Sequence, residues 1–268
     1  MAGPILLPTP LASNSLALGQ LLSDPLNPYS TSFLSTATSQ AIREPSVQSR
    51  YKDVVSHDDE GRLVSSLSGR PLPSSQENLL IIQADQMEYR SLKHPTRTFN
   101  TIRQDPDARS FLGSMGLRNQ PLYYIVGLQQ LKNPTFKRAV VNEGPAGASV
   151  TEATQGADPK IRLPMHVRRD SAMDLDECGG GTDGIFGLEV RKVVCHVGRK
   201  DEPHSLGDIG LEWTYHELDS EDLQLSIGLG KALDAVELRT LAGIVSDDDF
   251  SDASYVSDYS DEEGQAGF

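Results

Sequence analysis

The chain has 268 residues, 37% of them hydrophobic, and its 24 Lys+Arg against 38 Asp+Glu give a formal net charge of −14. This apolar content is enough for a folded core and excludes a wholly disordered chain, while the acidity argues against a general nucleic-acid binder. There is no apolar run of about 18 residues that would predict a transmembrane helix, and only two cysteines occur, which favours a reducing cytosol over a disulfide-stapled secreted scaffold.

Irregular structure and strands are predicted for the first part of the chain. Residues 1–15 are rich in Pro, Ser and Leu and are expected to be irregular. Residues 27–50 are rich in Ser, Thr and Pro and are expected to form loops. The apolar run that begins at Leu79 predicts a strand to about residue 90, and Leu122–Leu128 is the best candidate for a buried strand.

Two short helices are expected between these strands. Phe99 and Ile102 have the i,i+3 spacing of a helix face. Asp105 is a good N-cap and Pro106 a good first helical residue, so a second helix is predicted over about 106–115. The residues expected to be buried in the second helix are Phe111 and Leu112.

The middle of the chain alternates between predicted loops and strands. Residues 142–160 are rich in Gly, Ala, Thr and Pro, and 170–184 contain three consecutive glycines beside acidic residues, so both are expected to be loops. Between them, Ile161–Val167 predicts a short strand, and Leu188–Val197 predicts another.

The clearest periodicity lies near the C-terminus. Apolar and polar residues alternate over Ile209–Tyr215 and again over Leu223–Leu229, with a polar turn at 219–222, which predicts a β-hairpin with one wet face. Lys231–Ile244 then predicts a helix. Its expected apolar face is Leu233, Val236, Leu241 and Ile244. This order of elements predicts an α+β fold, with helices packed on a twisted antiparallel sheet.

Charge is strongly segregated along the chain. Residues 246–268 hold eight acids and no base, whereas residues 90–138 hold nine bases and two acids, or +7. The basic stretch is either a solvated face or a site for an anionic partner, of which a membrane surface is the sharper hypothesis and nucleic acid the weaker one. The candidate lipid-binding residues are Arg90, Lys93, Arg97, Arg103, Arg109, Arg118, Lys132, Lys137 and Arg138.

No catalytic or metal-binding signature is found in the sequence. Cys178, Cys195, His196 and His204 lack zinc-site spacing, and the neighbours Cys195 and His196 leave a strand on opposite faces, so inert cysteines are expected. His216 is interpreted as an exposed histidine. The triple glycine at 179–181 and the acidic cluster Asp174, Asp176 and Glu177 are interpreted as a hinge and a solvated loop. We therefore predict no enzyme, no cofactor and no metal.

The acidic tail from residue 245 to 268 is expected to be disordered in isolation. It is either a solubilising segment or an electrostatic cover over the basic stretch. Ser246 and Ser260 precede acidic residues, and phosphorylation there would strengthen such a cover.

Four segments carry a family resemblance: residues 18–25 (Leu-Gly-Gln-Leu-Leu-Ser-Asp-Pro), 122–128 (Leu-Tyr-Tyr-Ile-Val-Gly-Leu), 187–193 (Gly-Leu-Glu-Val-Arg-Lys-Val) and 209–213 (Ile-Gly-Leu-Glu-Trp). In this order they resemble the fungal gasdermin-like cell-death proteins of heterokaryon incompatibility. The resemblance covers roughly residues 15–244 and implies one α+β domain over 16–244.

The resemblance also implies a function. It implies oligomerisation on acidic phospholipids, with itself or a related protein, and a pore that kills the cell. The resemblance implies that the protein moves from the cytoplasm to the cell membrane on activation, with proteolytic removal of the C-terminal segment as a candidate trigger and Phe250 marking a candidate cleavage neighbourhood. The alternative is a non-catalytic soluble module that binds a partner or a small ligand in a fungal pathway.

Overall fold

The computed structural model describes residues 3–36, 41–67, 78–144, 147–153, 183–200, 211–218 and 222–244. The strands in this part of the chain are β1 (Ile5–Ala12), β2 (Gln20–Leu22), β3 (Ser32–Leu34), β4 (Ser46–His57), β5 (Leu63–Ser66), β6 (Leu79–Ser91), β7 (Leu122–Lys132), β8 (Thr135–Gly144), β9 (Gly147–Glu152), β10 (Gly184–Arg199), β11 (Glu212–Glu217) and β12 (Leu223–Ala232). The helices are α1 (Pro95–Ile102), α2 (Pro106–Leu117) and α3 (Ala235–Leu241).

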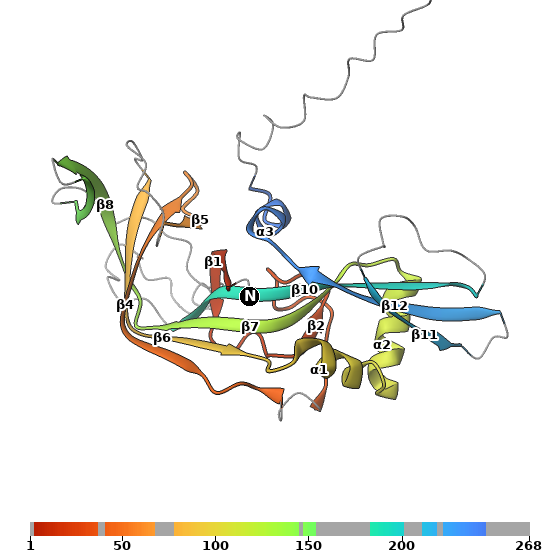
Figure 1. Cartoon of the computed structure of the whole chain (residues 1–268). Helices are drawn as coiled ribbons and strands as arrows, with labels where there is room; N and C mark the ends of the chain where they lie inside the picture. Colours follow the sequence, from red (N-terminus) through yellow and green to blue (C-terminus); the bar gives the residue numbers. More distant parts are fainter. Residues whose placement is uncertain are drawn as a thin grey trace, which may run out of the picture.

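The strands form one open sheet in the order β11-β12-β10-β7-β6-β4-β5, with β1 beside β10, β2 beside β7, and β8 beside β6. Every recorded strand pair is antiparallel. Figure 1 shows α1 and α2 on one side of the sheet and α3 on the other. The predicted α+β class with an antiparallel sheet is therefore confirmed. No helix in the described ranges combines the length and the apolar character that crossing a bilayer requires.

The sheet has two distinct ends (Figure 1). At one end, β4, β5 and β6 sweep away from the body together with β8, over a small core that includes Val55, Leu80 and Ile82. At the other end, α1 and α2 cover the sheet over the main core, in which Phe99 and Leu112 are fully buried. Both helices are thus fixed on the sheet by buried residues, and this packing positions the side chains that they expose.

Helix α2 begins where the sequence predicts. The Asp105 side chain accepts a hydrogen bond from the Asp107 amide at 3.0 Å, and Pro106 lies in the first turn. Leu112 is fully buried as expected, while Phe111 is half-buried and stacks on Phe33 with ring centroids 5.6 Å apart.

The predicted strands over Leu79–90, Leu122–128 and Leu188–197 are confirmed as β6, β7 and β10. Residues 122–128 are all buried, because β7 lies between β6 and β10 and is covered on both faces. A continuous apolar run is the expected sequence for such a strand.

The prediction of irregular structure at the N-terminus is wrong for residues 5–12, which form β1. The register with β10 breaks between Leu6 and Leu11, so Pro8 and Pro10 fall in the irregular stretch. A proline that lacks an amide proton is tolerated at such a bulge. Similarly, the expected loop over 27–50 contains β3 and the beginning of β4.

The expected loop over 142–160 is also wrong in part. Residues 135–144 and 147–152 pair as the β8–β9 hairpin, with Val141 opposite Val150. β-Branched residues favour strands, and the glycines around them concealed this pattern. The predicted strand Ile161–Val167 and most of the predicted loop at 170–184 lie outside the described residues.

The C-terminal hairpin is confirmed as β11–β12. The prediction that one face of this hairpin is exposed to solvent is wrong for β12. Residues 225–230 of β12 are all buried. The reason is that Gly228 and Gly230 leave room for the Leu211 and Trp213 side chains to pack over the face expected to be polar. Helix α3 is shorter than the predicted Lys231–Ile244, because β12 extends to Ala232. Of the expected apolar face, Leu233 and Ile244 are buried, whereas Val236 and Leu241 are exposed.

Candidate functional site

The nine basic residues predicted to bind lipid do not form one surface. Five of them lie on or beside α1 and α2 and are called the α1–α2 cations below: Lys93, Arg97, Arg103, Arg109 and Arg118. Arg90 lies opposite Leu128 on β7, at the end of β6 that leads into α1. The other three lie further along the sheet: Lys132 opposite Gln86, Arg138 opposite Leu80 and Lys137 opposite Ile81, all on β6. Figure 1 shows β8 and α2 at opposite ends of the molecule.

Two of the residues outside the α1–α2 cations have acidic partners. The Lys137 ammonium lies 3.0 Å from the Glu152 carboxylate, and Arg90 Nε lies 3.5 Å from Glu88. The sequence-level idea of a single cationic surface is therefore wrong, because a long antiparallel strand carries neighbouring residues of the chain far apart in space.

The α1–α2 cations divide into two kinds. Lys93, Arg97 and Arg118 are exposed and form no ion pair with any described residue. Arg103 and Arg109 are half-buried instead. The Arg103 guanidinium lies 6.0 Å from the centre of the Phe99 ring, and burial lowers its pKa, an effect opposed by the charge of Glu212.

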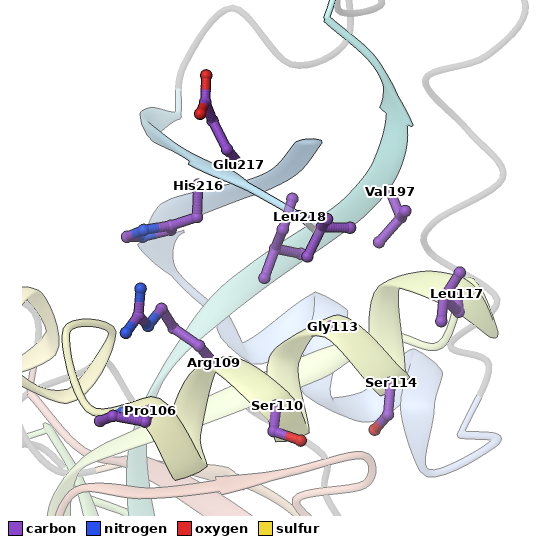
Figure 2. A pocket seen from close by; sticks show the side chains of 11 residues that line it. Pro106, Arg109, Ser110, Gly113, Ser114, Leu117, Val197, His216, Glu217 and Leu218 are labelled. Carbon is purple, nitrogen blue, oxygen red and sulfur yellow. The ribbon is translucent and has the colours of Figure 1, made fainter. Parts of the chain in front are cut away.

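A cavity of about 410 Å³ lies between α2 and strands β10, β11 and β12. Its apolar lining comes from both walls: Gly113 and Leu117 from α2, and Val197, Leu218 and Leu225 from the strand side. Figure 2 shows Leu218 and Val197 facing the helix across the cavity. The absence of a side chain at Gly113 keeps this wall open, since an added Cβ would lie 3.8 Å from the Leu225 side chain.

Polar nitrogens gather at one end of the cavity. In Figure 2 the Arg109 guanidinium and the His216 ring point toward each other, whereas Glu217 points away. Glu217 is instead bonded to Lys200 at 2.9 Å. Three buried nitrogen atoms have no hydrogen-bond partner there or next to it: His216 Nε2, Arg109 Nε and Arg103 Nη1.

The expectation that His216 is a simple exposed histidine is wrong. The residue is half-buried, and its pKa is lowered below 6.5, first by burial and then by the charges of Arg109 and Arg103. Because a positive histidine would be repelled by both guanidinium groups, the neutral ring is favoured. Period-two alternation had placed His216 on the polar side of β11, but nothing in the sequence indicated that this side faces α2.

The cysteine and histidine residues form no centre in the described part of the chain. Cys195 is buried and its pKa is raised to about 12 by burial, while His196 is exposed on the opposite face of β10. No group of three or more potential metal ligands occurs among the residues that the structure describes. The other sequence candidates lie outside them: Asp174, Asp176, Glu177, Cys178, residues 179–181, His204, Ser246, Phe250 and Ser260.

No protein-family model matches the chain, and no curated protein matches it. Among solved structures, the chain is similar to a bacterial gasdermin from Bradyrhizobium tropiciagri, with 10% sequence identity and a TM-score of 0.29, over 71% of this chain and 82% of that chain. That neighbour is bacterial rather than fungal, and a TM-score of 0.29 does not establish a common fold. Membership of the fungal gasdermin-like proteins therefore stays a prediction.

Proposed function

We propose that this protein binds anionic membranes through the end of the sheet covered by α1 and α2, and that it permeabilises the bilayer. The observation that carries the proposal is the set of three exposed cations there, Lys93, Arg97 and Arg118, without an ion-pair partner among the described residues. The chain as a whole carries −14 and would be repelled by anionic lipid. Only a local concentration of positive charge allows such a protein to attract an acidic membrane.

The packing beneath these cations supports a stable binding face. Phe99, Ile102 and Leu112 are fully buried, so both helices are anchored on the sheet. The acidic residues of α1, α2 and the turn between them are Asp105 and Asp107, and the Asp105 carboxylate is already bonded to the backbone at the start of α2. Glu212 of β11 also acts on Arg103 through its charge. The cations therefore outnumber the local carboxylates on an element that holds them in place.

The fuller proposal follows the sequence resemblance. The protein acts from the cytoplasm, assembles with copies of itself or a related protein on acidic phospholipids of the cell membrane, and forms a pore that causes regulated cell death. The eight acids of residues 246–268 restrain membrane binding by competing for the cations, and proteolysis, with Phe250 as a candidate neighbourhood, removes that restraint.

Membrane binding is tested by co-sedimentation with vesicles that contain phosphatidylserine. The variant Arg97→Glu/Arg118→Glu is compared with Lys132→Glu/Arg138→Glu, which makes the same change of net charge at exposed positions away from α1 and α2. Each basic residue near the headgroups contributes about 1 kcal/mol, and each added glutamate is repelled by the headgroups, so the first variant is expected to bind at least roughly 25-fold more weakly. Equal losses in both variants would show that net charge, and not this face, determines binding.

Permeabilisation is tested by dye leakage from the same vesicles, with the full chain and with a chain that stops after Ile244. The shorter chain is expected to cause faster leakage, because it lacks the acidic segment. No leakage and no vesicle binding from either chain would refute the proposal. Recovery of a stoichiometric protein partner, without any effect on membranes, would favour the alternative of a soluble interaction module.

A further inference from the structure

The cavity beside α2 has a polar end and an apolar remainder. One end holds the partnerless nitrogens of Arg109 and His216, with Arg103 close enough to influence the histidine charge. The remainder is lined by apolar residues, among them Val197 and Leu225. Buried polar groups are nearly always hydrogen-bonded, so guanidinium N–H groups left without a partner indicate that an acceptor is supplied by something else. His216 Nε2 can donate to the same acceptor when the neutral ring carries its proton on Nε2.

The acceptor that fits this end is an anion. The two guanidinium groups are cations with N–H donors, and guanidinium geometry suits carboxylate or phosphate oxygens. No carboxylate among the described residues forms an ion pair with Arg103 or Arg109. Glu212 influences Arg103 only through its charge, and Glu217 is bonded to Lys200.

The apolar part of the cavity determines the rest of the ligand. A volume of about 410 Å³ lies within the range of small-molecule sites, roughly 300–1,000 Å³. Gly113 leaves the helix wall flat, and Leu117 is 74% exposed at the end of α2, where an apolar ligand would cover it. An inorganic anion alone would leave this apolar surface in contact with water.

We propose that the cavity between α2 and the β10–β12–β11 edge binds a single-chain amphipathic anion, with its carboxylate or phosphate at Arg109 and His216 and its apolar chain along Gly113, Val197 and Leu225. The site goes beyond the proposed membrane function. It binds one monomeric molecule in solution, and it uses the half-buried cations rather than the exposed ones. Vesicle binding and cavity binding therefore succeed or fail separately.

The binding test uses the full chain and isothermal titration calorimetry below the micelle concentration of each probe. The probes are dodecanoate, dodecyl phosphate, dodecanol and inorganic phosphate. The two chain-bearing anions distinguish carboxylate from phosphate, and the stronger of them is expected to bind at one site. Dodecanol and inorganic phosphate are expected to bind at least about tenfold more weakly, because dodecanol lacks the anionic group and inorganic phosphate lacks the apolar chain. Dodecanol binding as tightly as dodecanoate, or neither anion binding, would overturn the proposal.

Two variants locate the ligand in this cavity. Arg109→Gln removes the charge and is expected to weaken anion binding at least about tenfold, while Gly113→Leu fills the apolar part without changing the charge and is expected to do the same. Arg118→Gln is the matched control, since Arg118 is exposed and does not line the cavity. Unchanged binding in Arg109→Gln and Gly113→Leu would place the ligand elsewhere and overturn the assignment.

A measurement on the unmodified protein keeps the test valid if a variant does not fold. The imidazole proton signals of His216, assigned with His216→Gln, are followed by NMR against pH with and without the bound anion. A negative charge beside the ring stabilises its positive form, so the pKa of His216 is expected to rise on binding. A bound anion that leaves this titration unchanged is not at the proposed site.

Discussion

The centre of the sheet depends on one residue without a side chain. Gly127 on β7 lies directly opposite Glu189 on β10 and Ser91 on β6. The Tyr89 side chain of β6 crosses over this glycine and donates a hydrogen bond from its hydroxyl to the Glu189 carboxylate at 2.5 Å. A Cβ added at Gly127 would lie 2.8 Å from that hydroxyl oxygen and 2.9 Å from Glu189 Cβ. Gly127→Ala must therefore displace the tyrosine, the glutamate or the strand.

The cost of Gly127→Ala follows from these contacts. Overpacking contributes about 1–3 kcal/mol, and loss of the half-buried hydrogen bond about 1–2 kcal/mol. The better strand preference of alanine offsets about 0.5–1 kcal/mol. The free energy of unfolding is thus expected to fall by about 1–4.5 kcal/mol, measured by urea denaturation followed by far-UV circular dichroism.

The matched control is the same substitution at Gly113. An alanine Cβ there would lie 3.8 Å from the Leu225 side chain, an ordinary contact, in the interior of α2. Because alanine exceeds glycine in helix propensity, Gly113→Ala is expected to stabilise the protein by about 0.5–1 kcal/mol. In a Tyr89→Phe background, Gly127→Ala should cost at least about 1 kcal/mol less than in the wild type. An equal cost in both backgrounds would refute the reasoning.

Three further predictions concern single groups. In a Cys178→Ser background, Cys195 is expected to resist alkylation at about pH 8 until denaturant is added, because its pKa is raised to about 12 by burial; labelling of the folded protein, detected by mass spectrometry, would contradict this. The lowered pKa of His216 means that this residue binds a proton more readily in the unfolded chain than in the folded one. Acidification from about pH 7.5 to pH 5 should therefore lower the free energy of unfolding more in the wild type than in His216→Gln. Chemical denaturation of both proteins at both pH values measures this difference. Asp234→Ala removes the side-chain oxygen that accepts a hydrogen bond from the Glu237 amide at the start of α3, while the bond from the residue 234 amide to the Glu237 carboxylate can remain. The free energy of unfolding should fall by about 0.5–2 kcal/mol, and a neutral result would show that α3 does not depend on this cap.

The sequence predicted those parts of the fold that local chemistry determines. The start of α2 was predictable because Asp105 and Pro106 act on their own backbone neighbours. The strand at Leu122 was predictable because a run of apolar residues is sufficient evidence of burial on both faces. In both cases the required information lies within a few residues.

The errors occur where distant segments override the local pattern. Pro8 and Pro10 indicate irregular structure, yet β10 accommodates them at a break in register. Gly228 and Gly230 look like the polar side of a hairpin, yet Leu211 and Trp213 cover them. Small residues and prolines mark positions where another part of the chain approaches or pairing stops, and the sequence does not say which.

The candidate sites show the same limit more sharply, because charge is counted along the chain but acts through space. Residues 90–138 carry nine bases, yet the bend from β6 into α1 and the return along β7 send Lys132, Lys137 and Arg138 to a different end of the sheet. The cations that stay near α2 differ in burial. Arg97 and Arg118 are exposed to solvent, while Arg109 is half-buried and lines the same cavity as His216, which lies about a hundred residues later in the chain. One stretch of positive charge thus provides an exposed face suited to a surface and a half-buried pair suited to a single anion. Because no residue is required by both, Arg118→Gln and Arg109→Gln should separate the two activities in one protein.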